Sequence, residues 1–416
     1  EALVYLKGRE RYGIKFGLSN IDRLAEALGR PERRYRSLLV AGTNGKGSTV
    51  ALSESILRAS GLRTGRYTSP HLRTVTERIG IEGQPISHEH LASVLSQVRQ
   101  AAETLFEGES QGSAPTYFEA LTAAAFLAFA ERDIDTAVFE VGMGGRFDAT
   151  NIVPASVAVI CPIGFDHERF LGSTLAAIAS EKAAIIKPGR PVVVGRLPPE
   201  ALEVVREEAL AKGATLVAAL EEVSVRRERE KVRLLTPTRD YGLLDLPLAG
   251  DHQLENLALA VRAVECFSGG LSVEDVARGV AATEWPGRLQ RIPGEPSILL
   301  DAAHNVMAVE SLVRYLETCP QRKRVLLFGV MKDKRVWEML SKLLPHVSAF
   351  VATRPEMSRA RDPERLARFA KERGVPAEAV RSPAAALARA RELAGREGEV
   401  LVAGSIFLLG EVMAEL

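Results

Sequence analysis

Short apolar runs alternate with longer stretches of helical character along much of the chain. The runs 37–42 (SLLVAG), 136–142 (TAVFEVG), 156–163 (SVAVICPI) and 190–195 (RPVVVG) are rich in β-branched residues and are bounded by turn or polar residues, which is typical of buried strands. The Ala-rich stretch 118–133 has the composition of a buried helix and leads directly into one of these runs. Strands that alternate with helices predict a parallel, doubly wound sheet.

Residues 220–248 interrupt this alternation. Three short segments there, VSVRRERE, KVRLLTPTR and YGLLDLPLAG, predict antiparallel strands and therefore a small β insertion. A second series of strands with helices between them then begins, with apolar runs at 297–304, 324–330, 348–355 and 399–405. The Pro- and Gly-containing segment before this series predicts a linker.

Composition and charge narrow the class of protein. The chain has 416 residues, 46% hydrophobic and 26% charged, and a net charge of +1, so no overall field favours nucleic acid or an anionic membrane. Three scattered cysteines are too few for a disulfide framework or a zinc cluster, and no apolar run approaches the ~20 residues that span a bilayer. We therefore expect a cytoplasmic monomer without nucleic-acid or membrane partners.

The strongest local signal is AGTNGKGST at 41–49, between a predicted strand and a predicted helix. Glycines let successive N–H groups face a phosphate, the helix N-terminus adds positive potential, and the lysine side chain reaches the outer phosphates. The alternative is a Gly-rich turn with an exposed lysine. The residues predicted to hold a nucleotide here are Thr43, Asn44, Gly45, Lys46, Gly47 and Ser48.

The loop departs from a strict Walker A sequence. Val40 stands in the place of the first glycine, and Gly47 follows the lysine where Ser or Thr is expected. The strand–loop–helix context still predicts an α/β protein with a P-loop ATPase-like doubly wound N-terminal domain, a small β insertion and a Rossmann-like α/β C-terminal domain. The predicted limits are 1–285 for the first domain, 286–296 for the linker and 297–416 for the second domain.

With Gly47 after the lysine, GTNGKGS resembles the nucleotide loop of the folylpolyglutamate synthase and dihydrofolate synthase branch of the Mur ligase superfamily. Further stretches resemble this branch, in order, along nearly the whole chain. They are TSPHL (68–72), ERIGIEGQPIS (77–87), PTYFEALT (115–122), FEVGMGGRFDATN (139–151), FDH (165–167), SEKAAIIKPG (180–189), HQLENLALA (252–260), WPGR (285–288) and DAAHN (301–305).

The resemblance implies an ATP-dependent ligase with Mg²⁺ as its metal. Such an enzyme adds L-glutamate to a folate, and we expect also to dihydropteroate, through an acyl phosphate. Two alternatives are a Mur-type cell-wall amino-acid ligase and a nucleotide-binding switch that makes no bond. The first is disfavoured because the phosphate loop already begins by residue 42, which leaves no obvious extra domain before it. The second leaves the polar residues described next without a role.

Glu140 closes a predicted strand and precedes a glycine-rich turn, which is where open α/β sheets place ligands. The resemblance implies that Glu140, His167 and Ser69 bind magnesium, although a core histidine or a buried strand-end acid would explain the first two as well. The resemblance also implies a catalytic role for Lys182, whose counterpart is often carbamylated. On composition alone Lys182 would be a solvated helix lysine.

The second domain and the linker supply further candidates. Asp301 ends a predicted strand, His304 follows in the same turn, and Arg288 lies in the linker. The resemblance implies that Asn256 and Asp301 contact the nucleotide and that Arg288 contacts its phosphates. It also implies that His304 lies near the incoming glutamate. The predicted catalytic residues are Lys46, Lys182 and His304. The alternative for the 301–304 turn is a plain strand end with an Asx cap.

The acceptor site is predicted from two motifs. Thr116 and Phe118 in PTYFE, with Arg146 and Asp148 in GGRFDATN, match the region where the family's bacterial members hold dihydropteroate. An aspartate is suited to accept hydrogen bonds from the pterin edge. Phe118 could instead be a core residue at the start of a helix.

Overall fold

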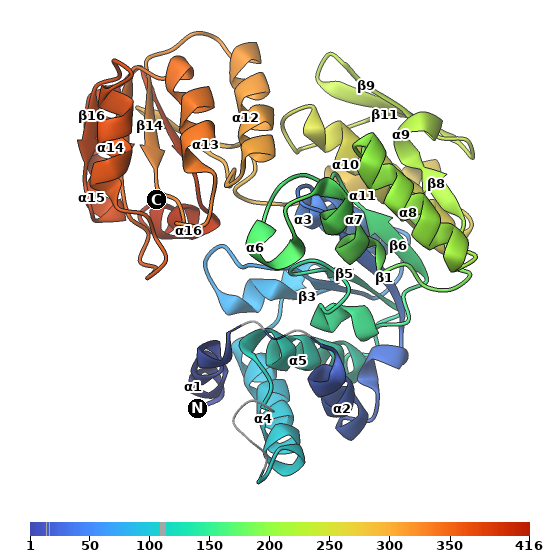
Figure 1. Ribbon diagram of the computed structural model, residues 1–416. Helices are drawn as coiled ribbons and strands as arrows, with labels where there is room; N and C mark the ends of the chain where they lie inside the picture. The colour runs from blue at the N-terminus through green and yellow to red at the C-terminus, as the bar shows by residue number, and fades with distance from the viewer. Residues whose placement is uncertain (14, 16, 109–113) are drawn as a thin grey trace.

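The computed structural model describes residues 1–13, 15, 17–108 and 114–416. Two α/β units lie side by side (Figure 1), and the larger one is formed by the N-terminal part of the chain. Its eight-stranded sheet has the order β4-β3-β2-β5-β1-β6-β7-β8, with parallel pairing from β2 to β8 and an antiparallel β3–β4 edge. Its strands are β1 (Arg36–Ala41), β2 (Thr64–Tyr67), β3 (Ile79–Ile81), β4 (Gln84–Pro85), β5 (Thr136–Glu140), β6 (Val157–Ile160), β7 (Val192–Val194) and β8 (Leu216–Ala218).

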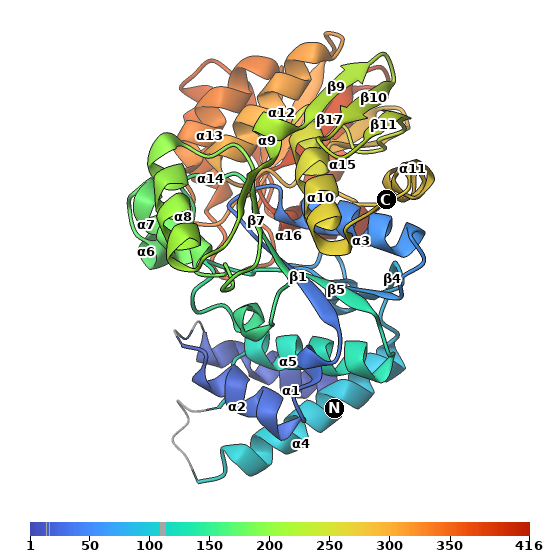
Figure 2. The ribbon, with the colours of Figure 1, turned by 90° about the vertical axis from the view of Figure 1, so that its right-hand side faces the viewer.

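The central strands are apolar on both sides because helices cover both faces of the sheet (Figure 2). In β1, Leu39 belongs to the core on one face and Leu38 to the core on the other. One face packs against α1 (Ala2–Gly8), α2 (Ser19–Ala27), α4 (His88–Leu105), α5 (Tyr117–Glu131), α6 (Glu168–Leu171), α7 (Leu175–Ala183) and α8 (Pro199–Ala211). The other packs against α3 (Lys46–Ala59), α9 (Ala219–Glu222), α10 (His252–Ser268) and α11 (Val273–Ala281).

The predicted β insertion is confirmed as a three-stranded antiparallel sheet of β9 (Ser224–Glu228), β10 (Lys231–Leu235) and β11 (Asp240–Leu244). A buried carboxylate, Glu265 of α10, fastens it to the larger unit. Its Oε1 accepts hydrogen bonds from Tyr241 at 2.8 Å and Thr236 at 2.7 Å, and its Oε2 accepts one from Arg262 at 2.6 Å. Burial raises the pKa of Glu265, but these bonds outweigh it and hold that pKa below its usual value.

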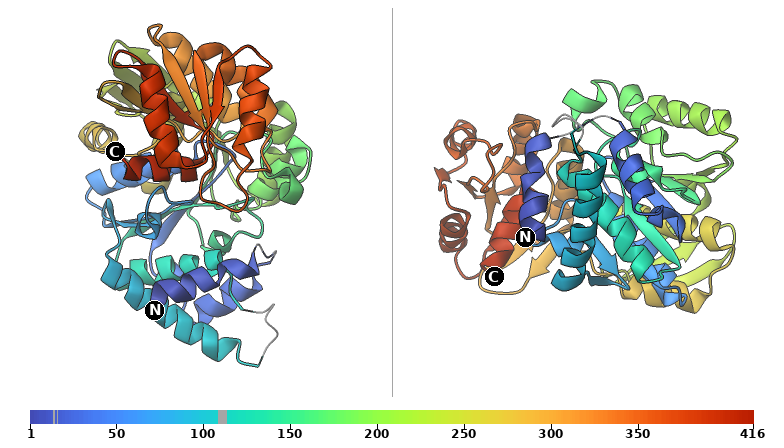
Figure 3. Two further views of the ribbon diagram at one scale, coloured as in Figure 1. Left: turned by 90° about the vertical axis from the view of Figure 1, so that its left-hand side faces the viewer. Right: turned by 90° about the horizontal axis from the view of Figure 1, so that it is seen from below.

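The C-terminal unit has its own six-stranded sheet, with helices on both sides (Figure 3, left). Its order is β12-β13-β17-β14-β15-β16, and only β12 pairs antiparallel. The strands are β12 (Gln290–Ile292), β13 (Ser297–Leu300), β14 (Arg324–Phe328), β15 (Ala349–Ala352), β16 (Ala377–Ala379) and β17 (Glu399–Ala403). The helices are α12 (Val306–Thr318), α13 (Val336–Leu343), α14 (Pro363–Lys371), α15 (Pro383–Ala394) and α16 (Ile406–Ala414).

The predicted fold class is confirmed: both units alternate strands and helices around largely parallel sheets. Several strands of two to four residues, β2, β3, β4, β8 and β16, have no counterpart in the predicted elements, because runs this short carry little periodicity. The segment expected as a linker, 286–296, contains β12, which pairs with β13. The exact domain limits stay a prediction.

The two units meet closely where α16 packs on the loop after β2. A Cβ added to Gly410 would lie 1.9 Å from the carbonyl oxygen of Leu72, so only glycine allows this approach. A Cβ at Gly287, ahead of β12, would come within 3.2 Å of Leu409 in the same helix. Among the described residues, no helix is long and apolar enough to cross a membrane.

The packing of α11 on α3 yields a stability prediction. A Cβ at Gly279 would lie 2.5 Å from the Cα of Ile56, and Ser55 donates a 2.7 Å hydrogen bond to the Gly279 carbonyl. Gly279→Ala should therefore lower the free energy of unfolding by ~1–3 kcal/mol, although alanine favours a helix. Gly270→Ala is the control, because nothing lies within 4 Å of its Cβ position. Equal denaturant midpoints for the two variants would contradict this contact.

Candidate active site

The glycine-rich loop follows β1 and leads into α3 at Lys46. Gly45, the residue before the helix, has φ +86°, a conformation that favours glycine. A Cβ at Gly45 would lie 2.4 Å from Oδ1 of Asn256, so the loop backbone rests directly on this side chain of α10. The Asn256 amide in turn donates to Oε1 of the buried Gln253 at 2.8 Å, which fixes its orientation. The loop is thus shaped by glycine and held from the α10 side.

Gly47 is explained by a tryptophan. A Cβ at Gly47 would lie 2.5 Å from the Trp285 ring, which leaves no room for the Ser or Thr of a Walker A sequence. The Arg66 guanidinium lies 5.4 Å from the centre of the same ring, and the ring nitrogen is buried without a hydrogen-bond partner. Trp285 comes just before the predicted linker, so the first turn of α3 packs against the start of the connection between the units.

Lys46 and Glu140 face each other at the carboxyl ends of neighbouring strands. Lys46 Nζ lies 3.9 Å from Oε1 of Glu140 and donates to the Thr43 carbonyl at 3.3 Å. The other oxygen of Glu140 accepts a 3.1 Å hydrogen bond from the backbone N–H of Ser69. Burial raises the pKa of Glu140, and the Lys46 ammonium opposes that rise. The arrangement brings a phosphate-loop lysine, a buried carboxylate and the Ser69 loop together.

His167 lies at the end of a different loop, after β6, with φ +52°. Burial lowers the pKa of its imidazole to about 4, so the ring is neutral near pH 7, the state that binds metal. Oxygen atoms of Glu140 and Ser69 are the donors that magnesium prefers, and a neutral imidazole is compatible with them. Over the described residues, no group of three His, Cys, Asp or Glu side chains is already gathered as a metal cluster.

Asp166 connects this loop to the C-terminal unit. Its carboxylate lies 2.5 Å from Lys334 Nζ and 3.5 Å from His304 Nε2, and it accepts a 3.1 Å hydrogen bond from Asn305. Burial would raise the pKa of Asp166, but the His304 hydrogen bond and the Lys334 charge hold it well below its usual range. Asn305 also exchanges hydrogen bonds of 2.9 and 3.1 Å with Asn44 of the glycine-rich loop. His304 is therefore placed beside the phosphate loop by a polar network that crosses between the units.

Lys182 is buried, contrary to the solvated helix lysine that its composition alone suggested. Its Nζ donates a 2.9 Å hydrogen bond to the carbonyl of Gly42 beneath the loop. Burial lowers its pKa to about 7, with a further contribution from the Lys46 charge. At neutral pH a large fraction of this amine is unprotonated and nucleophilic.

Arg288 and Asp301 lie at the junction of the two units. Asp301 follows β13 and accepts backbone hydrogen bonds from Leu289 at 3.0 Å and Ala303 at 2.9 Å, which is the strand-end turn that the sequence allowed. Burial raises its pKa, and the Arg288 guanidinium opposes the rise. Burial lowers the pKa of Arg288, and the charges of Asp301 and Glu140 oppose that shift.

The four predicted acceptor residues divide into two groups. Thr116 caps α5: its hydroxyl accepts a 3.2 Å hydrogen bond from the Glu119 N–H, and the Glu119 carboxylate accepts a 2.8 Å hydrogen bond from the Thr116 N–H. Phe118 is half-buried, 5.9 Å from the Tyr67 ring and close to Gly142. Of the two, Phe118 lies against the turn that follows β5.

Arg146 and Asp148 hold that turn itself. Arg146 pairs with Glu181 at 3.1 Å, one residue before Lys182. Asp148 accepts hydrogen bonds from the Met143 backbone at 3.0 Å and from both the N–H and hydroxyl of Thr150 at 3.0 and 2.5 Å. The Asp148 oxygens are thus engaged by their own loop. A direct contact of Asp148 with a pterin stays a prediction.

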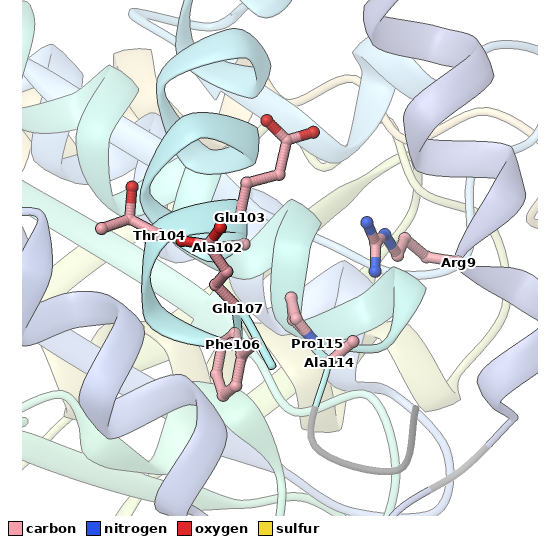
Figure 4. Close-up of a pocket in the computed structure, with 8 residues that line it drawn as sticks. All are labelled: Arg9, Ala102, Glu103, Thr104, Phe106, Glu107, Ala114 and Pro115. Atoms are coloured by element: carbon pink, nitrogen blue, oxygen red, sulfur yellow. The ribbon is translucent and has the colours of Figure 1, made fainter. Parts of the chain in front are cut away.

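Two surface hollows lie away from these residues. One, of about 470 Å³, is formed by the end of α4, the segment before α5 and Arg9 (Figure 4). Its lining includes Pro115, next to Thr116, but none of the predicted site residues. A second, of about 480 Å³, lies at the opposite end of β1, where four arginines and two aspartates gather. The candidate site is therefore the polar junction itself.

Sequence reasoning missed several residues of this junction. Asp166 lies inside the FDH motif but was not selected, and its charge next to His167 was the available signal. Trp285 lies in WPGR, and only the missing Ser or Thr at position 47 hinted that something fills that space. Lys334 and Gln253 carry no local signal, because their roles come from contacts between distant segments.

Comparisons with known proteins agree with this geometry. The Mur ligase middle domain matches residues 40–264, and the Mur ligase glutamate ligase domain matches residues 287–406. A dihydrofolate synthase/folylpolyglutamate synthase from Bacillus subtilis is 38% identical over 354 residues, 82% of each chain.

Two solved structures extend the likeness over nearly the whole chain. Mycobacterium tuberculosis folylpolyglutamate synthase complexed with ADP superposes with a TM-score of 0.93 at 34% identity, covering 99% of this chain and 98% of that one. A bifunctional folylpolyglutamate synthase/dihydrofolate synthase with Mn, AMPPNP and L-glutamate bound gives 0.88 at 31% identity, covering 99% and 97%.

The contact of Gly47 with Trp285 predicts a defect in nucleotide binding. In Gly47→Ala the new methyl group would overlap the ring, so the first turn of α3 must shift away from the phosphates. We expect the affinity for ADP with Mg²⁺, measured by calorimetry, to fall about tenfold. Adding Trp285→Ala removes the overlap and should recover part of the loss. An undiminished affinity in the single variant would contradict the assignment of this loop.

Proposed function

This chain belongs to the folylpolyglutamate synthase/dihydrofolate synthase branch of the Mur ligase family, and we propose that it is an ATP-dependent ligase that joins L-glutamate to a folate. The observation that carries the proposal is the junction where the loop after β1, the end of β5 and the end of β13 meet. It combines a phosphate loop on one unit with Asp301 and His304 on the other, linked through Asp166 and the Asn44–Asn305 pair. A ligase of this kind needs such a site, because the carboxylate must first meet the γ-phosphorus of ATP and the amine of glutamate must then meet the carbon of the resulting acyl phosphate.

The first step is activation of a carboxylate. An oxygen of the folate carboxylate attacks the γ-phosphorus of ATP, the bond to the bridging oxygen breaks, and ADP leaves with an acyl phosphate formed. Lys46, and Arg288 extending from the second unit, offset the negative charge on the phosphoryl oxygens. Asn256 and Asp301 hold the nucleotide, and the backbone N–H groups of the loop 43–48 cradle its phosphates.

Magnesium is the proposed metal, held by Glu140, Ser69 and His167. Bound there, it neutralises charge on the phosphates of ATP. Glu140 suits this role because it is buried and only one of its oxygens accepts a hydrogen bond, so the other faces the site.

The second step forms the amide. The α-amine of L-glutamate attacks the acyl carbon, the tetrahedral intermediate expels phosphate, and the amine nitrogen gives up a proton. His304 lies at the start of the second unit's site, with Nδ1 2.9 Å from the Ala302 carbonyl and Nε2 directed at Asp166. We assign His304 to orienting the incoming glutamate. Small molecules are the expected partners; the monomeric, cytoplasmic state stays a prediction.

Lys182 is proposed to be carbamylated. Carbamate formation joins an unprotonated amine to CO₂ with loss of a proton, and the amine of Lys182 has a pKa near 7. The product is an anion, which replaces a buried cation beside Lys46 and is favoured there for that reason.

A labelling experiment tests the carbamate. With ¹³C-bicarbonate, the native protein should give a carbamate carbon signal in NMR that strengthens as pH rises from 6 to 8, because the unprotonated fraction of Lys182 increases through its pKa of about 7. Lys182→Arg should lack the signal, since an arginine stays protonated. Lys187→Arg is the control for other lysines. A signal that persists in Lys182→Arg would contradict the assignment.

We further propose that the chain accepts dihydropteroate as well as reduced folates. The chemistry is the same for both, but the reacting carboxylate lies at different distances from the pterin. The region of Thr116, Phe118, Arg146 and Asp148 supports a pocket for the shorter acceptor.

Product analysis tests both activities at once. Incubated with ATP, Mg²⁺ and L-glutamate, the protein should convert dihydropteroate to dihydrofolate and tetrahydrofolate to its glutamylated form, as measured by mass. Phe118→Ala should raise KM for dihydropteroate several-fold with little change in KM for ATP, because we assign the ring to the acceptor pocket and not to the nucleotide. Product from tetrahydrofolate alone would leave a monofunctional enzyme. No product from either acceptor, with turnover of a nucleotide-linked muramyl peptide, would identify a cell-wall ligase instead.

A further inference from the structure

The residues on both sides of His167 are each paired with a cation of the other unit. Asp166 lies 2.5 Å from Lys334, and Glu168 accepts two hydrogen bonds of 2.8 Å from Nε and Nη2 of Arg335. Lys334 and Arg335 are consecutive residues just before α13, and Glu168 is the first residue of α6, which Figure 1 places at the boundary between the units. The neighbouring cations Lys334 and Arg335 thus pair with the two acidic residues on either side of His167.

The Arg335 contact has the features of a specific pair. Its Nε and Nη2 atoms each donate to a different carboxylate oxygen of Glu168, which is the bidentate geometry of the strongest charge-assisted hydrogen bonds. The guanidinium also lies 4.8 Å from the centre of the Phe165 ring, two residues before His167. Arg335 therefore contacts the histidine loop on both sides of His167.

The backbone of the loop explains why such support matters. His167 has φ +52°, a conformation that costs free energy for a residue with a side chain. Within its own unit, the His167 N–H donates a 2.8 Å hydrogen bond to Asp166 Oδ1, and the His167 carbonyl accepts backbone hydrogen bonds from Phe170 at 2.8 Å and Leu171 at 3.1 Å. The pairs with Lys334 and Arg335 restrain the loop from the opposite side.

We propose that Arg335 and Glu168 are positioning residues that latch the C-terminal unit onto the loop 165–168 and thereby orient the His167 imidazole for metal binding. The consequence for the reaction rests on the proposed function. Docking of the C-terminal unit, which receives glutamate, favours occupation of the metal site at His167, and occupation of that site favours docking. Because coupling between two binding events is reciprocal, a variant without the latch should weaken both.

The test compares Arg335→Ala and Glu168→Gln with a matched control, Arg396→Ala. Arg396 also donates from two nitrogens to one glutamate, at 2.9 and 2.6 Å, but both bonds go to a single oxygen of Glu295 and the pair lies within the C-terminal unit. Mn²⁺ is titrated into each protein in the presence of ADP and followed by electron paramagnetic resonance, and KM for L-glutamate and for ATP is measured beside it. Circular dichroism and thermal unfolding verify that each variant is folded.

We expect the Kd for Mn²⁺ and KM for L-glutamate to rise about threefold or more in Arg335→Ala and Glu168→Gln, with KM for ATP nearly unchanged. The charge exchange Glu168→Arg/Arg335→Glu should recover part of the loss. Mn²⁺ affinities equal to that of Arg396→Ala in both folded variants would overturn the latch. Weakened Mn²⁺ binding in a protein whose native form glutamylates neither acceptor would support the latch and refute the proposed function.

Discussion

The two halves of the site depend on one buried carboxylate, Asp166, which receives Lys334, His304 and Asn305 from the C-terminal unit. Its side chain is only 8% exposed, so removing these partners would leave an unpaired charge at low dielectric, which is costly. The loop that carries Asp166 also carries His167, and Asn305 reaches Asn44 in the phosphate loop. The placement of His167, the glycine-rich loop and His304 therefore follows from one set of contacts.

Burial at this junction also shifts the pKa values of other site residues. Burial raises the pKa of Glu140, and the Lys46 charge opposes that rise. Burial lowers the pKa of Lys182 to about 7, and the Lys46 charge contributes to that decrease. Each shift suits the proposed chemistry. A carboxylate that is poorly neutralised by the protein alone favours a bound cation, and an amine that is partly unprotonated can take up CO₂. These properties arise from the junction of loops and not from any single motif.

Much of this arrangement could be predicted from the sequence. The glycine-rich loop after a β-branched run specified α3 and its lysine, and the acid that ends β5 in an otherwise apolar strand indicated a ligand site. The contacts between the units could not be predicted in this way. Lys334 and Arg335 lie in an ordinary polar turn, and their partners are about 167 residues away in the chain, so no local pattern signals the pairing. Trp285 was likewise unselected, because its role is to fill space beside a glycine.

Asp148 is the opposite case. Its residue type suggested a ligand contact, whereas four hydrogen-bond donors of its own loop surround it, those of Gly142, Met143 and Thr150.

In the proposed reaction, this junction activates a carboxylate by transferring the γ-phosphoryl group of ATP to it. Tetrahydrofolate with ¹⁸O in the reacting carboxylate tests it most directly, because the oxygen that attacks phosphorus leaves with the phosphate when the amide forms. After turnover with unlabelled ATP and L-glutamate, we expect one ¹⁸O in each inorganic phosphate released, in proportion to the fraction of labelled oxygen. Amide product accompanied by phosphate without ¹⁸O would contradict it.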